Sequence, residues 1–492
     1  MLLHTLLKQL HPRPTLTGVP NVEITGIQDD SRLVRPGNLF VARPGTRVDG
    51  GHFARDAHGR GAVACVTQAP IPGCPMPQVR VDDATTVVSP LAHAFFGNPS
   101  ATVRVLGVTG TNGKTTTTYI VRHLLAHVKQ RCGLVGTVEI DDGKTRREAT
   151  MTTPGAVELA ELLASMRDKG CRACAMETSS HSLDQGRVAG ITYAGAGFTN
   201  LTGDHLDYHK TMEHYAAAKA RLFAMLPAEA VAVVNADDKW SDRMIQDCPA
   251  RIMRFGFGKK ADYRARDVAV TAQGTNFELI TPDGRAHVQT GLIGRHNIEN
   301  VLLAAGLVGE VYGLSVHQIA AGLKTATGAP GRLQRVDAGQ PFAVLVDYAH
   351  TDDALENVLT ALRPLCKGKL RVLFGCGGNR DATKRPRMAR TAERLADAVY
   401  VTSDNPRREQ ALDIISQVVA GFSADKGKTA VVVEPDRRTA IERICADAEP
   451  GDVVLLAGKG HENYQIIGDE KRHFDDVEEA TRALTVHRQR AA

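Results

Sequence analysis

The stretch VRVLGVTGTNGKTTTT, residues 103–118, decides the fold, because it combines a strand, a glycine-rich turn and the start of a helix. Its first six residues are largely apolar and β-branched, which is typical of a buried strand. Gly110 and Gly113 let the backbone turn tightly and approach an anion without a Cβ clash. Apolar residues then recur at helical spacing, so Lys114–Thr118 should form the first turn of a helix, where unpaired N–H groups favour a phosphate.

These features predict a phosphate-binding loop for ATP. Lys114 can reach the terminal phosphates, and the Thr115 hydroxyl can ligate their Mg²⁺. The strict pattern G-x-x-x-x-G-K-[ST] is not met, because Val108 stands where the first glycine should be. The alternative is an ordinary strand-to-helix turn that happens to contain GKT. The expected ATP contacts are Gly110, Thr111, Asn112, Gly113, Lys114, Thr115 and Thr116.

Length and composition exclude several classes of protein. A chain of 492 residues is too long for one ordinary core, so several domains are expected. The formal net charge is +5 without a basic run, which disfavours a nucleic-acid role. Nine cysteines without disulfide-like spacing favour the cytoplasm, and the CxxC at Cys171 and Cys174 is interpreted as two core cysteines rather than a metal site. No signal peptide or apolar stretch of membrane-spanning length is present in the sequence.

The strand and helix pattern predicts an α/β protein of three domains. Residues 1–97 form a small N-terminal domain, 98–330 a central P-loop-type ATPase domain with a mostly parallel sheet, and 331–492 a C-terminal Rossmann-like domain. The glycine- and proline-rich segment GAPGRLQ, 328–334, marks the second boundary. The polar segment from Asp29 to Gly50 is interpreted as a solvated loop.

Polar clusters follow the predicted strands, at the edge where open α/β sheets bind ligands. Glu177 follows the strand 173–176 and is either a magnesium ligand or a surface carboxylate. His205 and His209 are four residues apart, a spacing at which histidines more often cap or pack than bind magnesium. Lys219 lies among alanines in the predicted helix 212–225, and its composition predicts a solvated lysine.

Eight motifs in one order resemble those of the Mur ligase family. The motifs are GTNGKTT at Gly110, ETSSH at Glu177, DHLDYH at Asp204, GRHNIEN at Gly294, DYAH at Asp347, GCGGNRD at Gly375, DNPR at Asp404 and GKGHE at Gly458. The resemblance implies an ATP-dependent, amide-bond-forming ligase of peptidoglycan synthesis that is cytoplasmic and monomeric. DNPR implies the members that add meso-2,6-diaminopimelate to the D-glutamate of UDP-N-acetylmuramoyl-L-alanyl-D-glutamate through an acyl phosphate.

The resemblance also assigns site residues. It implies catalytic roles for Lys114, Glu177, His205 and Lys219, and metal ligation by Thr115, Glu177, His205 and a carbamylated Lys219. The implied nucleotide contacts outside the loop are Asn297, Arg332 and Asp347. Those for the UDP-sugar peptide are Ser31, Thr152, Thr153, Ser179, Gln185 and Arg187. Those for the incoming amino acid are Arg380, Asp404, Asn405, Pro406, Arg407, Gly458 and Glu462.

Arg407 is expected to distinguish diaminopimelate from lysine, because a guanidinium pairs with the extra carboxylate through two parallel bonds. Asp404 and Glu462 suit an ammonium group. Three positions depart from the family pattern: Asn379 replaces a common aspartate, Lys210 a common glycine and Asp352 a common proline.

Three other interpretations remain open at this stage. A folylpolyglutamate synthetase-like ligase shares the ATP loop but does not account for DNPR or the long N-terminal domain. A P-loop kinase or mechanical ATPase leaves the C-terminal motifs unexplained. A catalytically inactive binding protein would not need Lys114, Glu177 and His205.

Overall fold

The computed structural model describes residues 1–45, 48–271, 273–423 and 429–491, with side chains as far as residue 486. The chain forms two compact units. The first contains residues 1–264, 280–284 and 299–319, and the second contains 265–279, 285–298 and 320–492. Because the units interleave between residues 265 and 320, they do not test the three predicted domain ranges, which stay a prediction.

The N-terminal part of the first unit is a parallel four-stranded sheet in the order β1-β2-β3-β4. Its strands are β1 (Gly26–Gln28), β2 (Asn38–Ala42), β3 (Ala64–Thr67) and β4 (Gln78–Arg80), and its helices are α1 (Leu3–Leu7), α2 (Ala54–Gly59) and α3 (Ala84–Phe95). The solvated loop predicted between Asp29 and Gly50 is wrong at its centre, where all of β2 is buried. Three apolar residues, 39–41, supply enough burial to form a strand despite their polar flanks; residues 46 and 47 lie outside the description.

An eleven-stranded sheet contains the predicted phosphate loop. Six strands in the order β12-β11-β10-β5-β9-β6 pair in parallel, β7 and β8 continue the β6 edge antiparallel, and β13, β14 and β15 extend the other edge. The bounds are β5 (Arg104–Thr109), β6 (Cys132–Val135), β7 (Glu139–Asp141), β8 (Arg146–Glu148), β9 (Ala173–Glu177), β10 (Tyr193–Phe198), β11 (Val231–Asn235), β12 (Arg251–Gly256), β13 (Tyr263–Thr271), β14 (Gly274–Thr281) and β15 (Gly284–Thr290). The parallel centre agrees with the sequence pattern, and the sheet as a whole is mixed.

Helices cover this sheet and present the carboxyl end of β5 to ligands. They are α4 (Lys114–His127), α5 (Ala156–Asp168), α6 (Ser180–Asp184), α7 (Leu206–His209), α8 (Met212–Ala224), α9 (Ser241–Ile245), α10 (Arg295–Tyr312) and α11 (Val316–Leu323). Strand β5 lies between β9 and β10, which continue the chain to opposite sides of the sheet. This is a topological switch point, where α/β sheets bind nucleotides. Cys171 and Cys174 are both buried as free thiols in the core, as predicted.

The second unit is built on a six-stranded sheet in the order β16-β17-β21-β18-β19-β20, in which only β16 pairs antiparallel within the described residues. A two-stranded ribbon, β22-β23, follows it. The strands are β16 (Gln334–Val336), β17 (Ala343–Asp347), β18 (Leu370–Phe374), β19 (Ala398–Val401), β20 (Ala430–Val433), β21 (Val453–Ala457), β22 (Tyr464–Ile467) and β23 (Glu470–His473).

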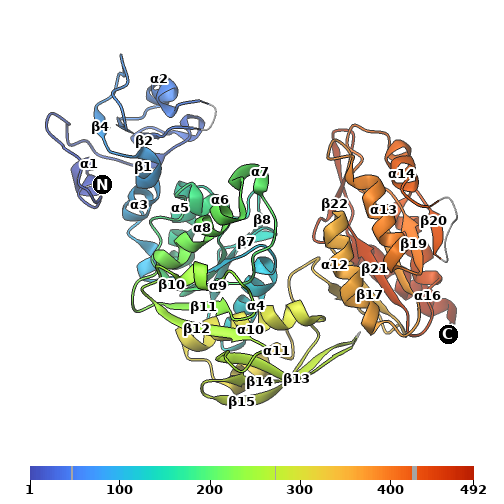
Figure 1. Ribbon diagram of the computed structural model, residues 1–492. Coiled ribbons are helices and arrows are strands. Elements are labelled where there is room, and N and C mark those ends of the chain that lie inside the picture. Colours follow the sequence, from blue (N-terminus) through green and yellow to red (C-terminus); the bar gives the residue numbers. More distant parts are fainter. Residues whose placement is uncertain (46–47, 272, 424–428, 492) are drawn as a thin grey trace. The chain divides into compact units, whose positions relative to one another are not determined.

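Successive side chains along these strands pack alternately against two layers of helices. Leu345, Val372 and Leu455 share a core with α12 (Asp352–Leu362), α13 (Lys384–Leu395) and α14 (Ala411–Val419). Their neighbours Val346, Leu373 and Leu456 share another with α15 (Arg437–Ala446) and α16 (Asp476–Ala491). Because strand side chains alternate between faces, the result is a sheet between two helical layers. Figure 1 shows α12, α13 and α14 together on one side of it.

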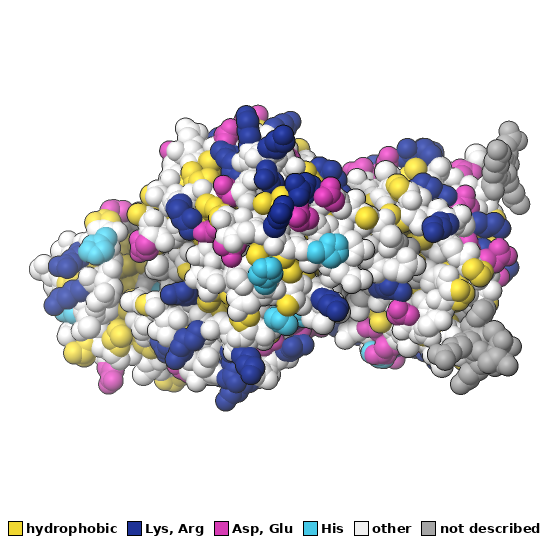
Figure 2. Space-filling model, turned by 90° about the horizontal axis from the view of Figure 1, so that it is seen from below, with side chains coloured by type: hydrophobic (Ala, Val, Ile, Leu, Met, Phe, Trp, Pro, Cys, Tyr) yellow, Lys and Arg dark blue, Asp and Glu magenta, His cyan; other side chains and the backbone are white. Residues whose placement is uncertain are grey.

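The charged side chains on the surface are distributed as the scattered charges of the sequence suggest. In the view of Figure 2, basic and acidic side chains are interspersed over the exposed face. Among the described residues, no helix has both the length and the apolar character needed to cross a membrane.

Candidate active site

The phosphate loop has the predicted strand–turn–helix geometry. Gly110 follows β5 at φ 143°, and Gly113 precedes α4 at φ 87°, conformations that favour glycine. A Cβ on Gly110 would lie 1.8 Å from Thr199 Oγ1, and one on Gly113 would lie 2.3 Å from Asn300 Oδ1. Neither position therefore has room for a larger residue.

Two lysines converge on the first glycine of this loop. Lys114 Nζ donates to the carbonyl oxygens of Gly110, at 2.9 Å, and Thr111, at 2.8 Å. Lys219 Nζ donates to the same Gly110 oxygen at 2.8 Å. It also lies 4.4 Å from the centre of the Tyr215 ring. The loop thus holds two ammonium groups around one carbonyl, in a part of the sheet suited to anions.

The solvated environment predicted for Lys219 is wrong, because its relative exposure is only 1%. Tyr215 and Lys219 are one helical turn apart on the buried face of α8, and this face packs toward β5. Burial, and then the charge of Lys114, lower the pKa of Lys219 well below its usual range, while Asp204 opposes this shift. A neutral amine is therefore more accessible here than at an exposed lysine.

Glu177 ends β9 beside Val108 of β5 and is fully buried. Its Oε1 accepts from the Thr137 N–H at 2.8 Å, and its Oε2 accepts from the Thr137 hydroxyl at 3.1 Å. The surface carboxylate considered from sequence is thus excluded. A Cβ on Gly136 would lie 2.4 Å from Glu177 Oε1, so the chain approaches this carboxylate closely. Thr137 did not stand out in the sequence, because it belongs to none of the motifs.

Several residues that were predicted to bind the UDP-sugar peptide lie around Glu177, at the end of β9. Thr152 Oγ1 lies 3.0 Å from Thr137 Oγ1. Thr153 Oγ1 donates to the carbonyl of Glu177 at 2.8 Å and lies 3.3 Å from Ser179 Oγ. Ser179 also caps α6 by accepting from the N–H of Ser182. These hydroxyls therefore form one connected group.

Arg187 and Gln185 continue that group. Arg187 Nε donates to Gln185 Oε1 at 3.0 Å, and Arg187 Nη1 donates to the Thr153 carbonyl at 3.1 Å. Burial first, and then the charge of Arg43, lower the pKa of Arg187. Ser31 is buried in the short 3₁₀ helix after β1, and Arg43 contacts Asp29 at 2.8 Å. Arg43 and Asp29 of the N-terminal part both interact electrostatically with Arg187, and no direct contact joins Ser31 to Arg187 among the described residues.

The histidines form an aromatic cluster rather than a shared helical face. His205 precedes α7 at φ 54°, and its ring lies 4.9 Å from that of His181. His209 lies 5.5 Å from His181, and its Nε2 lies 2.9 Å from Ser180 Oγ. Burial is the first cause of the lowered pKa of both His181 and His209. The packing role considered for His209 is therefore correct, while His205 is half-exposed beside Asp204.

Lys210 and Asn379 both have positive φ, of 68° and 52°. A glycine adopts this conformation more readily than a lysine does. Asparagine tolerates it better than most residues do, so Asn379 fits its backbone.

The remaining predicted nucleotide residues belong to the second unit. Asp347 ends β17, where its two oxygens accept from the N–H groups of Leu333, at 2.7 Å, and Ala349, at 2.9 Å. Burial raises the pKa of Asp347, while the nearby Arg332 lowers it. Arg332 lies over the Tyr348 ring at 4.9 Å, and Asn297 Nδ2 donates to the Ile293 carbonyl at 2.8 Å.

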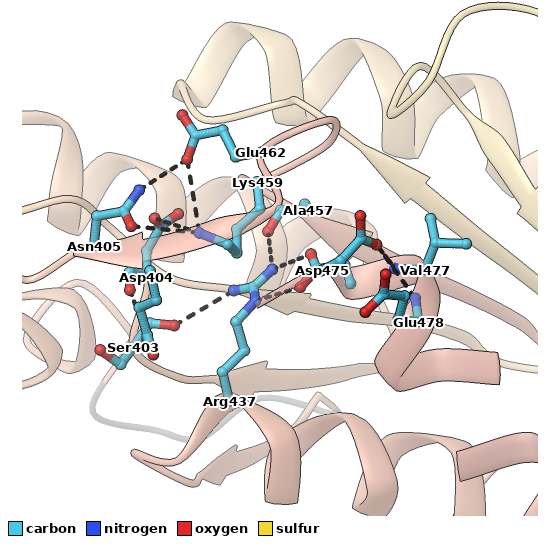
Figure 3. A network of polar contacts seen from close by, with 12 residues as sticks. Ser403, Asp404, Asn405, Arg437, Ala457, Lys459, Glu462, Asp475, Val477 and Glu478 are labelled. Atoms are coloured by element: carbon cyan, nitrogen blue, oxygen red, sulfur yellow. Dashed lines mark hydrogen bonds and ion pairs between the residues drawn. The ribbon is translucent and has the colours of Figure 1, made fainter. Parts of the chain in front are cut away.

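The DNPR and GKGHE motifs meet at one edge of the second sheet. Asn405 Nδ2 donates to Glu462 Oε2 at 2.8 Å, and the N–H of Gly378 donates to the Asn405 carbonyl at 2.9 Å. Gly458 has φ 112°, and a Cβ there would lie 2.9 Å from Asp404 Oδ2. Figure 3 shows Asp404, Asn405 and Glu462 around the ammonium of Lys459. Sequence reasoning missed Lys459, although it lies between two residues that were selected.

Arg407 is positioned by its backbone and by one side-chain bond. Its φ is 53°, its N–H donates to the Ile466 carbonyl at 3.0 Å, and its Nη1 donates to the Gly378 carbonyl at 2.9 Å. A Cβ on Gly377 would lie 2.9 Å from that Nη1. The carbonyl of Pro406 would contact a Cβ on Gly378 at 1.9 Å, so both glycines are needed for this packing. Arg380 opposes the raised pKa of Tyr348, and among the described residues it makes no hydrogen bond or ion pair with the other predicted residues of this site.

Among the described residues, no group of three or more histidine, cysteine, aspartate and glutamate side chains has metal-binding geometry.

Sequence comparison assigns this architecture to a class. Three family models match: the Mur ligase family catalytic domain over residues 23–96, the Mur ligase middle domain over 108–308, and the Mur ligase glutamate ligase domain over 331–460. The chain belongs to the Mur ligase family.

Among its relatives, this chain is similar to UDP-N-acetylmuramoyl-L-alanyl-D-glutamate–2,6-diaminopimelate ligases. It is 46% identical to that of Synechococcus elongatus over 474 residues, 94% of each chain, and 42% identical to that of Bacillus cereus over 491 residues, 99% of each chain. A solved structure of a ligase with this name is 33% identical, with a TM-score of 0.75, and the match covers 99% of this chain and 100% of the other. The match over 23–96 also favours this family over a folylpolyglutamate synthetase-like ligase.

Proposed function

We propose that this chain uses ATP to join meso-2,6-diaminopimelate to the D-glutamate carboxylate of UDP-N-acetylmuramoyl-L-alanyl-D-glutamate, in the cytoplasm and as a monomer. The observation that carries this function is the 42–46% identity to diaminopimelate ligases over nearly the whole chain. The three predicted domains, 1–97, 98–330 and 331–492, would hold the UDP moiety, ATP and the amino acid respectively.

The reaction needs an activated carboxylate. An amine does not displace oxide from a carboxylate at a useful rate, so the γ-phosphoryl group of ATP is first transferred to a carboxylate oxygen, releasing ADP. The amine of diaminopimelate then attacks the acyl phosphate, and inorganic phosphate leaves from the tetrahedral intermediate as the amine loses a proton. Negative charge develops on the phosphoryl oxygens during transfer, so preorganised cations and N–H groups stabilise the transition state.

The loop supplies those groups. The start of α4 directs backbone N–H groups toward an anion, and the Lys114 ammonium lies within the loop at Gly110 and Thr111. In the proposal, Lys114 exchanges its carbonyl partners for phosphate oxygens when ATP binds. Asn297, Arg332 and Asp347 would contact the rest of the nucleotide.

Magnesium would supply charge neutralisation at the phosphates. The oxygens of Thr115 and Glu177 fit its preference for hard donors, with His205 near a second ion. Lys219 as an ammonium does not fit, whereas its carbamate would present an anionic oxygen. The lowered pKa of the buried Lys219 amine supports this modification, since only the neutral amine adds carbon dioxide.

The two substrates would be bound by complementary charge. Ser31, Thr152, Thr153, Ser179, Gln185 and Arg187 offer donors to the anionic, hydroxyl-rich UDP-sugar peptide. Arg407 has five N–H donors and uses one for Gly378, so others are available to a carboxylate of diaminopimelate. Asp404 and Glu462 suit its ammonium, and Arg380, Asn405, Pro406 and Gly458 complete the amino-acid site.

Phosphate release with purified protein tests this function directly. The protein is incubated with ATP, Mg²⁺, the UDP-dipeptide substrate and either diaminopimelate or lysine. We expect release with diaminopimelate and little with lysine. Equal rates with both amino acids would refute the specificity, and release that does not depend on the UDP-dipeptide would refute the ligase function.

A further inference from the structure

Lys459 is a fully buried lysine among the residues proposed to bind the amino acid. Its relative exposure is 0%, and it follows Gly458 in the loop after β21. Its Nζ lies 3.4 Å from Asn405 Oδ1, 3.7 Å from Glu462 Oε2 and 4.0 Å from Asp404 Oδ1. Figure 3 shows these three side chains turned toward the ammonium. Because Lys459 is completely covered, it contacts the protein rather than an incoming substrate.

The loop is shaped to place this ammonium inward. Gly458 and Gly460 on either side of it have φ 112° and 53°, and the N–H of Glu462 donates to the Lys459 carbonyl at 2.9 Å. Asn405 connects the parts, since its Oδ1 also accepts from the N–H of Ile466 at 2.9 Å. A lysine in a solvated loop would need none of these constraints.

The charged side chains around Lys459 leave one negative charge uncompensated. Arg437 and Asp476 are both fully buried and pair through two hydrogen bonds, of 2.8 and 2.6 Å, so together they add no net charge. Asp404 and Glu462 carry two negative charges against the single positive charge of Lys459. One negative charge is left over, which matches one ammonium group of an amino acid.

Without an internal cation, Glu462 would ionise less readily beside Asp404. Burial, and then the charge of Asp404, raise the pKa of Glu462, whereas Lys459, Asn405 and Arg407 oppose this. Burial lowers the pKa of Lys459, and Asp404 and Glu462 oppose that shift. The other titratable or charged groups facing this cluster include Arg437, Asp476, Tyr464, Tyr348, His350 and Cys376. Glu462 thus depends on the lysine to stay charged.

We propose, on the basis of the diaminopimelate specificity proposed above, that Lys459 is a positioning residue: it is the internal counter-ion that holds the carboxylates of Asp404 and Glu462 together and oriented toward the ammonium of the incoming amino acid. Arg407 then binds the carboxylate at the same end of the incoming amino acid. The four side chains together present no net charge, which suits the zwitterionic end of diaminopimelate.

The test compares Lys459→Met with the unaltered chain and with Lys367→Met, which removes an exposed lysine of the same unit. Lys459→Met should raise the KM for diaminopimelate by about tenfold or more at pH 7, with much smaller changes in the KM for ATP. As the pH falls, Glu462 takes up a proton and kcat/KM for diaminopimelate declines. In Lys459→Met this decline should begin about one pH unit higher. Lys367→Met should match the unaltered chain.

A second substitution separates charge balance from packing. Adding Glu462→Gln to Lys459→Met removes the surplus negative charge, so the shifted acid decline should disappear. If Lys459→Met does not fold, Glu462→Gln alone carries the test, because it should abolish the acid decline of the unaltered chain. Persistence of that decline, or an unchanged KM and pH profile in Lys459→Met, would overturn the role of Lys459. Absence of diaminopimelate-dependent phosphate release from the unaltered chain would instead refute the proposed function.

Discussion

Lys114 and Lys219 donate hydrogen bonds to the same acceptor, the carbonyl oxygen of Gly110, at 2.9 and 2.8 Å. Two ammonium groups this close raise each other's electrostatic energy, and the burial of Lys219 adds a desolvation cost. An anion at the loop, or conversion of Lys219 to an anionic group, would relieve this repulsion. The arrangement therefore costs stability as long as no anion is bound.

The first prediction concerns the stability that is lost by burying the ammonium of Lys219. The pKa of Lys219 is lowered from a usual 10.5, so between the lowered value and 10.5 the unfolded chain binds one more proton than the folded chain. Stability thus rises with pH in this window. Lys219→Met, in unmodified protein, should raise the Tm near neutral pH, and its advantage should shrink as the pH approaches 10.5. Thermal unfolding across this range measures it, with the exposed Lys144→Met as control. A constant difference at all pH values would contradict the burial argument.

Carbamylation of Lys219 gives a second prediction. Lys219→Ala should abolish phosphate release, and a short carboxylic acid such as acetate should restore part of it by supplying the missing oxygens. Lys144→Ala should be fully active with or without acetate. Normal turnover by Lys219→Ala would show that the lysine is only structural.

The third prediction concerns the selection of the amino acid. Arg407→Ala should raise the KM for diaminopimelate far more than that for ATP, because a desolvated arginine–carboxylate pair is worth roughly 2–5 kcal/mol. The matched control is Arg408→Ala, since the adjacent Arg408 is exposed and pairs with Asp469 at 2.9 Å. Steady-state phosphate release with each substrate varied in turn separates the effects. Equal rises in both KM values would eliminate Arg407 as the discriminator.

The fourth prediction concerns the phosphate loop. Gly110→Ala should abolish ATP binding, because its Cβ would lie 1.8 Å from Thr199 Oγ1 and its φ is 143°. Thr199→Ala in the same chain should restore binding only in part, since the backbone strain persists. Gly155→Ala is the control, because a Cβ there meets no atom within 4 Å. Calorimetric titration with ATP measures the result, and tight binding by Gly110→Ala would show that this turn is not the phosphate site.

The sequence alone predicted the parallel strands and the phosphate loop well. The helix after Gly113 begins at Lys114 as expected, and β9 ends within a residue of the predicted strand 173–176. These features depend on local periodicity, glycine chemistry and β-branched runs, which are encoded by neighbouring residues. The antiparallel edges formed by β7, β8 and β16 were not predicted, because short polar strands carry little pattern.

By itself, the sequence determined the strand–loop–helix unit and the family motifs, because both are carried by residues close together along the chain. Only the tertiary structure decided the environment of Lys219 and Lys459. Both lysines look solvated from composition, yet each is covered by segments distant in sequence and faces partners such as Gly110 and Asp404. The burial and charge of a side chain depend on what packs against it, so neither can be deduced from its neighbours in the chain.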